Sequence, residues 1–398
     1  MDPAPAFIAA VPVDRLKVWV LAPSIVSEDA NIDYYYDFSQ SIAEYTRVFN
    51  ELSIEWVWQE VTLDSYTTVI DTILAEKKAG LVVPLVLNLC DGDEVNGAPG
   101  ISVVKYLEEN GLVYTGSDEY FYHVTTSKIP MKRAFDAAGV PNAAWETILS
   151  REQDISAVVQ KLGSPLIVKP AVSGGSMGVG TKNVVNDTEE LHQQVQRMFD
   201  GYRGWNLAAD GIIAESFIKG REFTVLIVGS YKHPDECKVY EPVERVFHPS
   251  LPDHERFLSF DRLWEIYEEE TPMPGEENFY EYELPADTAL CEKIKQLSLD
   301  AYIAVKGTGY TRVDLRMDQQ TGELLVLEVN AQCGLSEDED YTSIGAILRV
   351  SKASFTGLVM EIINDAFRRK IPQPVMMNES AGATVVPLSA GRARKKIK

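Results

Sequence analysis

The first part of the chain alternates between strand patterns and helical patterns. Three segments carry the continuous apolar or alternating pattern of strands: residues 16–22, 54–58 and 81–89. Between them, residues 38–49 and 67–76 place apolar side chains at helical spacing. Strand–helix–strand alternation of this kind is typical of a parallel sheet with right-handed crossovers. We therefore expect an N-terminal α/β domain over residues 1–120.

The rest of the chain predicts two further units with a more varied order of elements. The expected helices cover residues 127–138, 187–199, 286–305 and 353–367. The expected strands cover residues 165–170, 211–218, 222–228, 311–317 and 324–330. Asp187 stands where it can cap the helix that follows it. We divide this part into a central subdomain, residues 121–218, and a C-terminal domain, residues 219–371.

Two segments lack a clear period. Residues 242–285 are acidic and contain several prolines, which predicts a lid or a flexible loop. Residues 372–398 lose their periodicity and end in a basic run, which predicts a disordered tail. A targeting role for this tail is the less favoured interpretation.

Composition and charge limit the classes of function. The 398 residues suffice for two or three domains, and 45% hydrophobic with 24% charged residues is ordinary for a folded soluble protein. A net charge of −23 argues against binding nucleic acid or an anionic membrane by bulk attraction. The four cysteines are scattered, which indicates neither a zinc site nor a disulfide framework. No segment has the pattern of a membrane span or a signal peptide, so we expect a cytoplasmic protein.

A glycine-rich segment, residues 173–180, follows the predicted strand at residues 165–170. Glycines allow backbone N–H groups to approach an anion closely, so the segment resembles a phosphate-binding loop. It has neither the Walker A pattern nor the GxGxxG pattern, and a flexible hairpin is the alternative. Lys169 favours the phosphate site, because a lysine at the end of a buried strand is costly unless an anion meets it.

Two predicted strands carry polar residues at alternating positions. Arg312 and Asp314 share one face of a strand, and Glu328 and Asn330 share one face of the next. Carboxylate and amide oxygens suit Mg²⁺, which commonly also takes phosphate oxygens. The alternative is an exposed sheet face with cross-strand salt bridges. We favour the metal site because four residues of these strands would form an apolar opposite face: Leu315, Leu325, Leu327 and Val329.

Taken together, these segments resemble the D-alanine–D-alanine ligase family of the ATP-grasp superfamily. The resemblance extends from about Lys17 to Arg369. The matching segments are Tyr114-Thr-Gly-Ser117 with Lys128, Ile167-Val-Lys-Pro170 with its glycine loop, residues 215–224, Arg312-Val-Asp314 and residues 328–334. Each is modest alone, but their order and spacing together are specific. The resemblance implies an ATP-grasp fold of the α/β class, α+β in its ATP-binding part, with an N-terminal parallel-sheet domain before the central and C-terminal ATP-grasp domains.

The resemblance also implies roles for individual residues. The residues expected to bind ATP are Lys128, Lys169, Ser176, Glu215, Ser216, Phe217, Ile218, Glu222 and Leu327. Within this set, residues 215–218 would contact adenine and Glu222 the ribose hydroxyls. Asp314, Glu328 and Asn330 would bind two Mg²⁺ ions, with Mn²⁺ as an alternative. Arg312 and the Gly334 amide would stabilise an oxyanion while an amide or peptide bond forms through an acyl phosphate.

The chain departs from the family pattern where substrates would bind. A glycine pair and a Ser-x-Glu run are replaced near the N-terminus, which leaves Glu28 as a candidate contact for the first amino group. Asp91 stands where the family has a histidine, and Gly175 where it has a serine. The lid lysine of the family is absent, with Arg262 as its candidate substitute. These departures argue against two D-alanines as the substrates.

An acidic run follows the segment that carries Gly334. The family binds the carboxylate of its second substrate in this part, whereas here Glu337, Asp338, Glu339 and Asp340 precede Ser343. We name Glu337, Asp338 and Ser343 as substrate candidates. Adjacent carboxylates repel an anionic group, so we expect an acceptor amine that is cationic or lacks a free carboxylate. The alternative is an outward-facing, solvated loop.

Other functions stay open at this point. An ATP-grasp kinase or carboxylase would phosphorylate or carboxylate a small molecule. A catalytically silent nucleotide-binding subunit is the third hypothesis, disfavoured because Lys169, Arg312 and the candidate metal ligands are intact. The expected partners are a small-molecule carboxylate and an amine, without nucleic acid or membrane, and a homodimer is left open.

Overall fold

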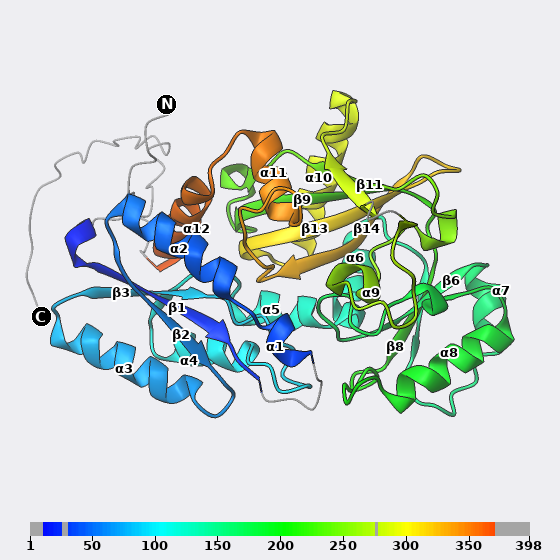
Figure 1. Cartoon of the computed structure of the whole chain (residues 1–398), viewed down its shortest axis with the longest axis horizontal. Helices are drawn as coiled ribbons and strands as arrows, with labels where there is room; N and C mark the ends of the chain where they lie inside the picture. The colour runs from blue at the N-terminus through cyan, green and yellow to red at the C-terminus, as the bar shows by residue number, and fades with distance from the viewer. Residues whose placement is uncertain (1–10, 26–30, 275–277, 371–398) are drawn as a thin grey trace, which may run out of the picture.

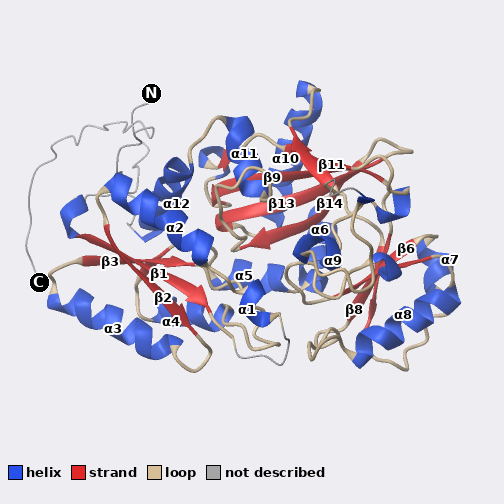
Figure 2. Cartoon of the chain, viewed as in Figure 1, coloured by secondary structure: helices blue, strands red, loops and turns tan. Residues whose placement is uncertain are grey.

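The computed structural model describes residues 11–25, 31–274 and 278–370. In these residues three β-sheets, one parallel and two antiparallel, carry helices on their faces (Figures 1 and 2). This confirms the predicted α/β architecture with an N-terminal parallel sheet. Glu28 and the expected tail, residues 372–398, lie outside the described residues. No described helix is long and apolar enough to cross a membrane.

The N-terminal sheet is parallel throughout. Its strands run in the order β2 (Glu55–Val61), β1 (Leu16–Pro23), β3 (Val83–Asn88) and β4 (Val113–Tyr114). Because side chains alternate along a strand, β1 sends Val18 and Val20 to one face and Trp19 and Leu21 to the other. The first face packs against α2 (Ser39–Leu52), and the second packs against α3 (Tyr66–Ala79) and α4 (Ile101–Glu109). The strand–helix alternation of the sequence thus forms the expected unit.

The central sheet is antiparallel. Its order is β5 (Trp145–Ile148), β8 (Ile212–Ser216), β6 (Leu166–Pro170) and β7 (Val184–Val185). The helices α7 (Val158–Leu162) and α8 (Thr188–Asp200) pack on its apolar face. Asp187 caps α8 as predicted, since its Oδ1 accepts the Glu190 N–H at 2.9 Å. The glycine-rich segment connects β6 to β7, strand to strand.

The C-terminal sheet is also antiparallel. Its order is β12 (Tyr280–Glu283), β11 (Val243–Phe247), β9 (Gly220–Ser230), β13 (Thr308–Asp318) and β14 (Leu324–Ala331), and β10 (Lys238–Val239) pairs with β9. One core unites β9, β13 and β14 with α5 (Glu119–Thr126), α6 (Lys128–Ala138) and α10 (Thr288–Ala304). A second core joins this sheet to the N-terminal sheet through α11 (Ser343–Ser351) and α12 (Phe355–Lys370). The two sheets are therefore fixed relative to each other.

Residues 242–285 are not one irregular lid. Their ends form β11 and β12, which pair with each other at the edge of the C-terminal sheet. Between them lies the short helix α9 (Phe260–Trp264). The prediction of a single loop was wrong. The prolines and acidic residues weaken the strand pattern of these two short edge strands, which are stabilised by pairing with neighbouring strands rather than by their own sequence. The remaining short elements are α1 (Ile32–Tyr35) and the 3-10 helices Val13–Arg15, Thr181–Asn183, Pro234–Glu236 and Asp253–Glu255.

Candidate active site

A cavity of about 740 Å³ lies where the three sheets approach one another. Strand β13 runs along it, and four alternate residues of that strand line it: Tyr310, Arg312, Asp314 and Arg316. Residues two apart on a strand are about 7 Å apart, so these side chains follow the cavity for about 20 Å. The even-numbered face of β13 therefore orders the cavity from one end to the other.

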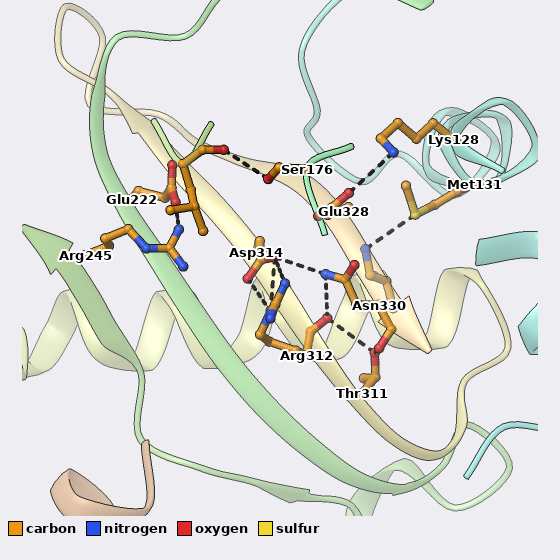
Figure 3. Close-up of polar contacts among 12 residues, drawn as sticks. Lys128, Met131, Ser176, Glu222, Arg245, Thr311, Arg312, Asp314, Glu328 and Asn330 are labelled. Atoms are coloured by element: carbon orange, nitrogen blue, oxygen red, sulfur yellow. Dashed lines mark hydrogen bonds and ion pairs between the residues drawn. The ribbon is translucent and has the colours of Figure 1, made fainter. Parts of the chain in front are cut away.

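The structure brings together the polar residues of β13 and β14. Arg312 pairs with Asn330 in the strand register, and Asp314 pairs with Glu328. Arg312 donates to the Asp314 carboxylate from Nη2 at 3.0 Å, and Asn330 donates to it from Nδ2 at 3.0 Å (Figure 3). Asp314 outweighs the effect of burial on Arg312 and raises the pKa of its guanidinium. The convergence expected from the spacing is thus present.

A β-bulge changes which residues of β14 face the cavity. The register shifts between Asp314 and Leu315, which pairs with Val326 and leaves Leu327 opposite no residue. Leu327 lines the cavity, whereas Val326 joins Val329 in the core behind the sheet. The expectation that Leu325 and Leu327 share the apolar face with Val329 was therefore wrong, because strict alternation does not continue through a bulge.

The oxygen atoms at this point suit a divalent cation. The Asn330 side-chain amide nitrogen donates a hydrogen bond to Asp314, so the side-chain carbonyl oxygen remains available to bind a metal ion. Among the residues that the structure describes, Glu328 has one ion-pair partner at a long distance, Lys128, whose Nζ lies 3.9 Å from Oε2. The described residues hold no cluster of three His, Cys, Asp or Glu side chains that could bind a metal. The candidate set is two carboxylates and an amide, which are hard ligands of the kind Mg²⁺ takes together with phosphate oxygens.

Two lysines hold a buried carboxylate at the end of β8. Glu215 lies 2.7 Å from Lys132 Nζ and 2.6 Å from Lys169 Nζ. Burial alone would raise the pKa of Glu215, but Lys132 and Lys169 outweigh it and lower that pKa to about 2. Lys128 lies close by, and burial lowers the pKa of its ammonium group. The anion that Lys169 meets is therefore a carboxylate of the protein itself, which the sequence pattern did not predict.

A second buried carboxylate, Glu222, is held between two arginines. Arg245 and Arg316 both form ion pairs with it (Figure 3 shows Arg245). Arg316 also donates to the Ile218 carbonyl oxygen at 3.0 Å. The Ile218 N–H donates to no residue in the described part of the chain and stands beside Phe217 on the cavity wall. An open N–H beside apolar side chains is suited to a flat heterocycle with a ring nitrogen.

The glycine-rich loop is covered by α9. Ser176 donates from Oγ to the Leu258 carbonyl oxygen at 3.0 Å, and Trp264 donates from Nε1 to the Gly175 carbonyl oxygen at 3.0 Å. Gly175 has a φ of 53° and its missing Cβ would lie 3.1 Å from the Trp264 ring. A serine here would be strained in backbone and crowded by Trp264, which accounts for its absence. Trp264 and Leu263 line the cavity beneath this cover.

Arg262 does not take the place of a lid lysine in the cavity. Its side chain is 2% exposed and binds Glu255 and Glu270, with Nε 3.0 Å from Glu270 Oε2. It is not among the residues that line the cavity. The expected substitution was wrong, because carboxylates within the same segment bind the guanidinium.

The substrate candidates divide into two groups. Asp91, Gly334 and Ser343 line the cavity. Glu337 and Asp338 do not: Glu337 pairs with Arg47, and Asp338 accepts the backbone N–H groups of its own turn. This arrangement favours the solvated-loop alternative for the acidic run. The remaining candidates, Ser216, Phe217 and Ile218, line the cavity near Glu215.

Several residues of the site were missed from the sequence. Arg316 continues the alternation of Arg312 and Asp314, and Lys132 lies one helical turn after Lys128, so both had a signal in the spacing. Tyr310 continues the same alternation in the other direction. No sequence pattern indicated Arg245, because its position in the site depends on the pairing of β11 with β9.

Known proteins resemble this chain in sequence. Residues 134–364, more than half of the chain, match the family model for the D-ala D-ala ligase C-terminus. The D-alanine–D-alanine ligase of Stutzerimonas stutzeri (strain A1501) is 28% identical over 265 residues, which cover 67% of this chain and 73% of that protein. The same enzyme of Xanthomonas axonopodis pv. citri (strain 306) is 28% identical over 255 residues, 63% of this chain and 69% of that protein.

Solved structures share the fold at lower identity. The D-alanine–D-alanine ligase from Bacillus anthracis complexed with ATP has a TM-score of 0.60 at 20% identity, covering 89% of this chain and 98% of that one. The ligase from Coxiella burnetii has a TM-score of 0.58 at 16% identity, covering 89% and 96%. At these identities the likeness shows that the chain has the ATP-grasp fold.

The buried pairs of Glu215 predict an acid-sensitive stability. The folded-state pKa of Glu215 is about 2, below its ordinary value of 4.5, so its contribution is complete above that ordinary value and is lost as the pH falls toward the folded pKa. The loss amounts to about 3 kcal/mol of the free energy of unfolding. Urea unfolding of the wild type at a series of acidic pH values measures it. Glu215→Gln should flatten this pH dependence and the exposed Glu152→Gln should not; equal slopes for Glu215→Gln and wild type would contradict the assignment.

Proposed function

The chain belongs to the D-alanine–D-alanine ligase family, and we propose that it is an ADP-forming ligase that joins a carboxylate and an amine other than two D-alanines. One observation carries the proposal. A single cavity is lined by paired lysines at one wall and by the Arg312, Asp314, Glu328 and Asn330 group at another. Such a site can hold a polyphosphate beside a carboxylate and neutralise the charge that moves between them.

The proposed nucleotide contacts follow the cavity wall. We assign adenine to the wall formed by Glu215, Ser216, Phe217, Ile218 and Leu327, supported by the open Ile218 N–H and the apolar side chains around it. Glu222 is assigned to the ribose hydroxyls, and its ion pairs with Arg245 and Arg316 fix its carboxylate on the cavity wall. Lys128, Lys169 and the loop that carries Ser176 are assigned to the phosphates.

We assign Asp314, Glu328 and Asn330 as the ligands of two Mg²⁺ ions, with Mn²⁺ as an alternative. Bound there, the two ions would neutralise phosphate charge. Arg312 donates toward the same point and is assigned to the oxyanion together with the Gly334 backbone N–H. The missing Cβ of Gly334 would meet no atom within 4 Å, so its backbone is open on that side.

The reaction then follows from these positions. A carboxylate oxygen of the first substrate attacks the terminal phosphorus of ATP, ADP leaves, and an acyl phosphate forms. The amine attacks the acyl carbon, Arg312 and the Gly334 amide stabilise the oxyanion, and phosphate leaves as the amide bond forms and a proton is lost from nitrogen. Water would hydrolyse the acyl phosphate, and we assign its exclusion to α9, whose Trp264 is hydrogen-bonded to the glycine-rich loop.

Three departures support substrates other than two D-alanines. Asp91 brings an acid into the cavity, Gly175 holds Trp264 against the loop, and Arg262 is bound within its own segment.

We also propose the domain division 1–120, 121–218 and 219–371, which assigns one sheet to each part. A homodimer and a cytoplasmic location remain proposals of the same kind.

The candidate metal ligands should be essential for turnover. Glu328→Gln and Asn330→Ala should each lower ATP-dependent phosphate release by about 100-fold, because each removes an oxygen ligand from the charge-stabilising group. Circular dichroism should show an unchanged fold, since both side chains lie on the cavity face. The exposed Glu323→Gln on the same hairpin is the matched control. Wild-type rates in either ligand variant would remove the metal assignment.

Lys169 should contribute more to nucleotide affinity than Lys128. Lys169→Ala should weaken ADP binding by about 10-fold, and Lys128→Ala by less, because the close ion pair with Glu215 fixes Lys169 on the cavity wall, whereas Lys128 has only the long pair with Glu328. Fluorescence titration with Mg-ADP measures both affinities. The exposed Lys182→Ala serves as the control. If Lys169→Ala binds ADP as the wild type does, the phosphate assignment fails.

D-Alanine should be a poor substrate. With hydroxylamine as the nucleophile, an acyl phosphate is trapped as a hydroxamate whatever the natural amine is. We expect hydroxamate formation from D-alanine to be slower by about 100-fold than from the best acid of a carboxylate panel, given the changed contacts around the substrate. D-Alanyl-D-alanine as the fastest product would reject the proposed substrate difference while leaving the ligase chemistry intact.

A further inference from the structure

The loop between β14 and α11 brings its first residues to the cavity. Gly334, Leu335 and Ser336 line the cavity, and their backbone N–H groups donate to no residue in the described part of the chain. These residues belong to no helix or strand. An N–H group stabilises a developing anion only when it is held in a fixed direction. The contacts that hold this loop therefore bear on the reaction.

Gln332 anchors the loop two residues before Gly334. The residue is 2% exposed, and its side chain binds the N-terminal part of the chain in two places. Its Oε1 accepts the Ser117 N–H at 2.7 Å, and its Nε2 donates to the Asn88 carbonyl oxygen at 2.8 Å. Asn88 ends β3, and Ser117 follows β4. The start of the loop is thus bound to the N-terminal sheet.

A second anchor, Glu44, holds the loop two residues after Gly334. Glu44 lies on α2, which packs on the N-terminal sheet, and is 6% exposed. Its Oε1 accepts the Ser336 hydroxyl at 2.7 Å and the Glu337 N–H at 3.3 Å. The Ser336 Oγ in turn accepts the Asp338 N–H at 3.2 Å. Gly334 therefore lies between two anchors, and both connect the loop to the N-terminal part of the chain.

The other contacts of this part of the loop do not set the direction of its N–H groups. Cys333 and Leu335 pack in the core that joins the two sheets, and apolar packing is not directional. Arg47 of α2 pairs with Glu337, but the two side chains are 43% and 38% exposed, and an exposed pair contributes little. The hydrogen bonds of Glu44 are buried, so we expect them to fix the loop at Ser336.

A carboxylate at position 44 is unfavourable for packing alone. No ion pair joins Glu44 to a described residue, and its Oε2 is buried without a hydrogen-bond partner among them. Burial raises the pKa of its carboxyl group, and the hydrogen bonds only partly offset this. Tyr45 and Val48 of the same helix lie in the core, so an apolar side chain would suit the position better. A residue that breaks the local pattern in this way indicates a functional role.

We propose that Glu44 is a positioning residue for the reaction: through Ser336 it fixes the direction of the Gly334 N–H. The inference rests on the proposed function, which assigns this N–H to the oxyanion. The step that depends on Glu44 is the attack of the amine on the acyl carbon, because the oxyanion forms in that step. The earlier transfer of phosphate to the carboxylate does not use this N–H. The N-terminal part of the chain thereby acts on amide formation.

The test measures the two steps separately. Carboxylate-dependent exchange of labelled ADP into ATP, without an amine, reports the acyl phosphate, and mass spectrometry of the amide reports the second step. The probes are the acid and the amine that react fastest with the wild type in panels of carboxylates, amino acids and alkylamines. Glu44→Ala should lower amide formation by about 30-fold and change the exchange by less than about 2-fold. Equal losses in both steps, or full amide formation, would overturn the inference.

Three further variants test the hydrogen bond itself. Glu44→Gln keeps an oxygen that accepts from Ser336 and should restore amide formation to within about 3-fold of the wild type. Ser336→Ala should lower amide formation by about 10-fold, and in combination with Glu44→Ala it should add nothing, since both variants remove one contact. Arg47→Ala removes an exposed contact of the same helix with the same loop and should leave both steps unchanged.

The outcomes of these variants that contradict the proposal are specific. A Glu44→Gln variant as slow as Glu44→Ala would reject the hydrogen-bond role. Additive losses in the double variant, or a loss in Arg47→Ala equal to that in Glu44→Ala, would reject it as well. Mg-ADP affinity checks that each variant keeps its nucleotide site.

Hydrogen–deuterium exchange tests the anchor without turnover. The Glu337 and Asp338 N–H groups are hydrogen-bonded to Glu44 and Ser336. Glu44→Ala should therefore speed amide exchange in a peptide that spans residues 332–342 by about 10-fold, while the exchange of α8 stays unchanged. Unchanged exchange of residues 332–342 would overturn the inference, whatever the activity of the variant.

The inference and the proposed function fail in different ways. If the wild type forms no amide from any pair of probes while Glu44→Ala speeds exchange in the loop, the ligase function is rejected and the anchor stands. If the wild type forms an amide and Glu44→Ala forms it equally fast, the ligase function stands and the positioning role is rejected.

Discussion

The pairing of charges around strand β13 is the constraint on which the site depends. Each described cation of the cavity wall lies within 4.0 Å of a carboxylate, and for a pair buried on both sides, such as Arg245 with Glu222, removing one partner costs about 3 to 5 kcal/mol. The pairs therefore hold side chains such as Arg312 and Lys169 in place before any ligand is present. A site arranged in advance loses little free energy in reorganising when charge develops on a substrate.

The fold supplies this arrangement by placing a polar sheet face between two apolar cores. Behind β13 and β14, residues such as Val313 and Val329 pack on α5, α6 and α10. The second core joins the C-terminal sheet to the N-terminal sheet through α11 and α12. This packing places the loop after β3, which bears Asp91, beside the cavity. Closure over the glycine-rich loop comes from α9, whose Trp264 binds a backbone carbonyl group rather than a ligand.

Local patterns predicted a large part of this site, and long-range contacts decided the rest. The alternation of side chains along a strand predicted that Arg312 and Asp314 share one face. The helix cap at Asp187 and the parallel N-terminal sheet were predicted from equally local patterns. The bulge after Asp314 could not be predicted, because it depends on how β14 pairs, and it moved Leu327 to the cavity face. The ion pair of Arg262 with Glu270 could not be predicted either, because it depends on how residues 242–285 fold back on themselves. Lys132 and Glu215 are far apart in sequence and contact each other only in the folded chain.

The two lysine pairs of the cavity differ in a way that bears on the proposed function. Lys169 lies 2.6 Å from Glu215, which Lys132 also holds, whereas Lys128 lies 3.9 Å from Glu328. A close pair shared by two lysines resists exchange, so Lys169 is best suited to a fixed position beside a phosphate. The long pair costs little to separate, which leaves Glu328 available to a metal ion and Lys128 to an anion at the same time. Under the proposed assignments each gains a new partner only when both ligands are present, so we expect a nucleotide and its metal ion to bind more favourably together than either does alone.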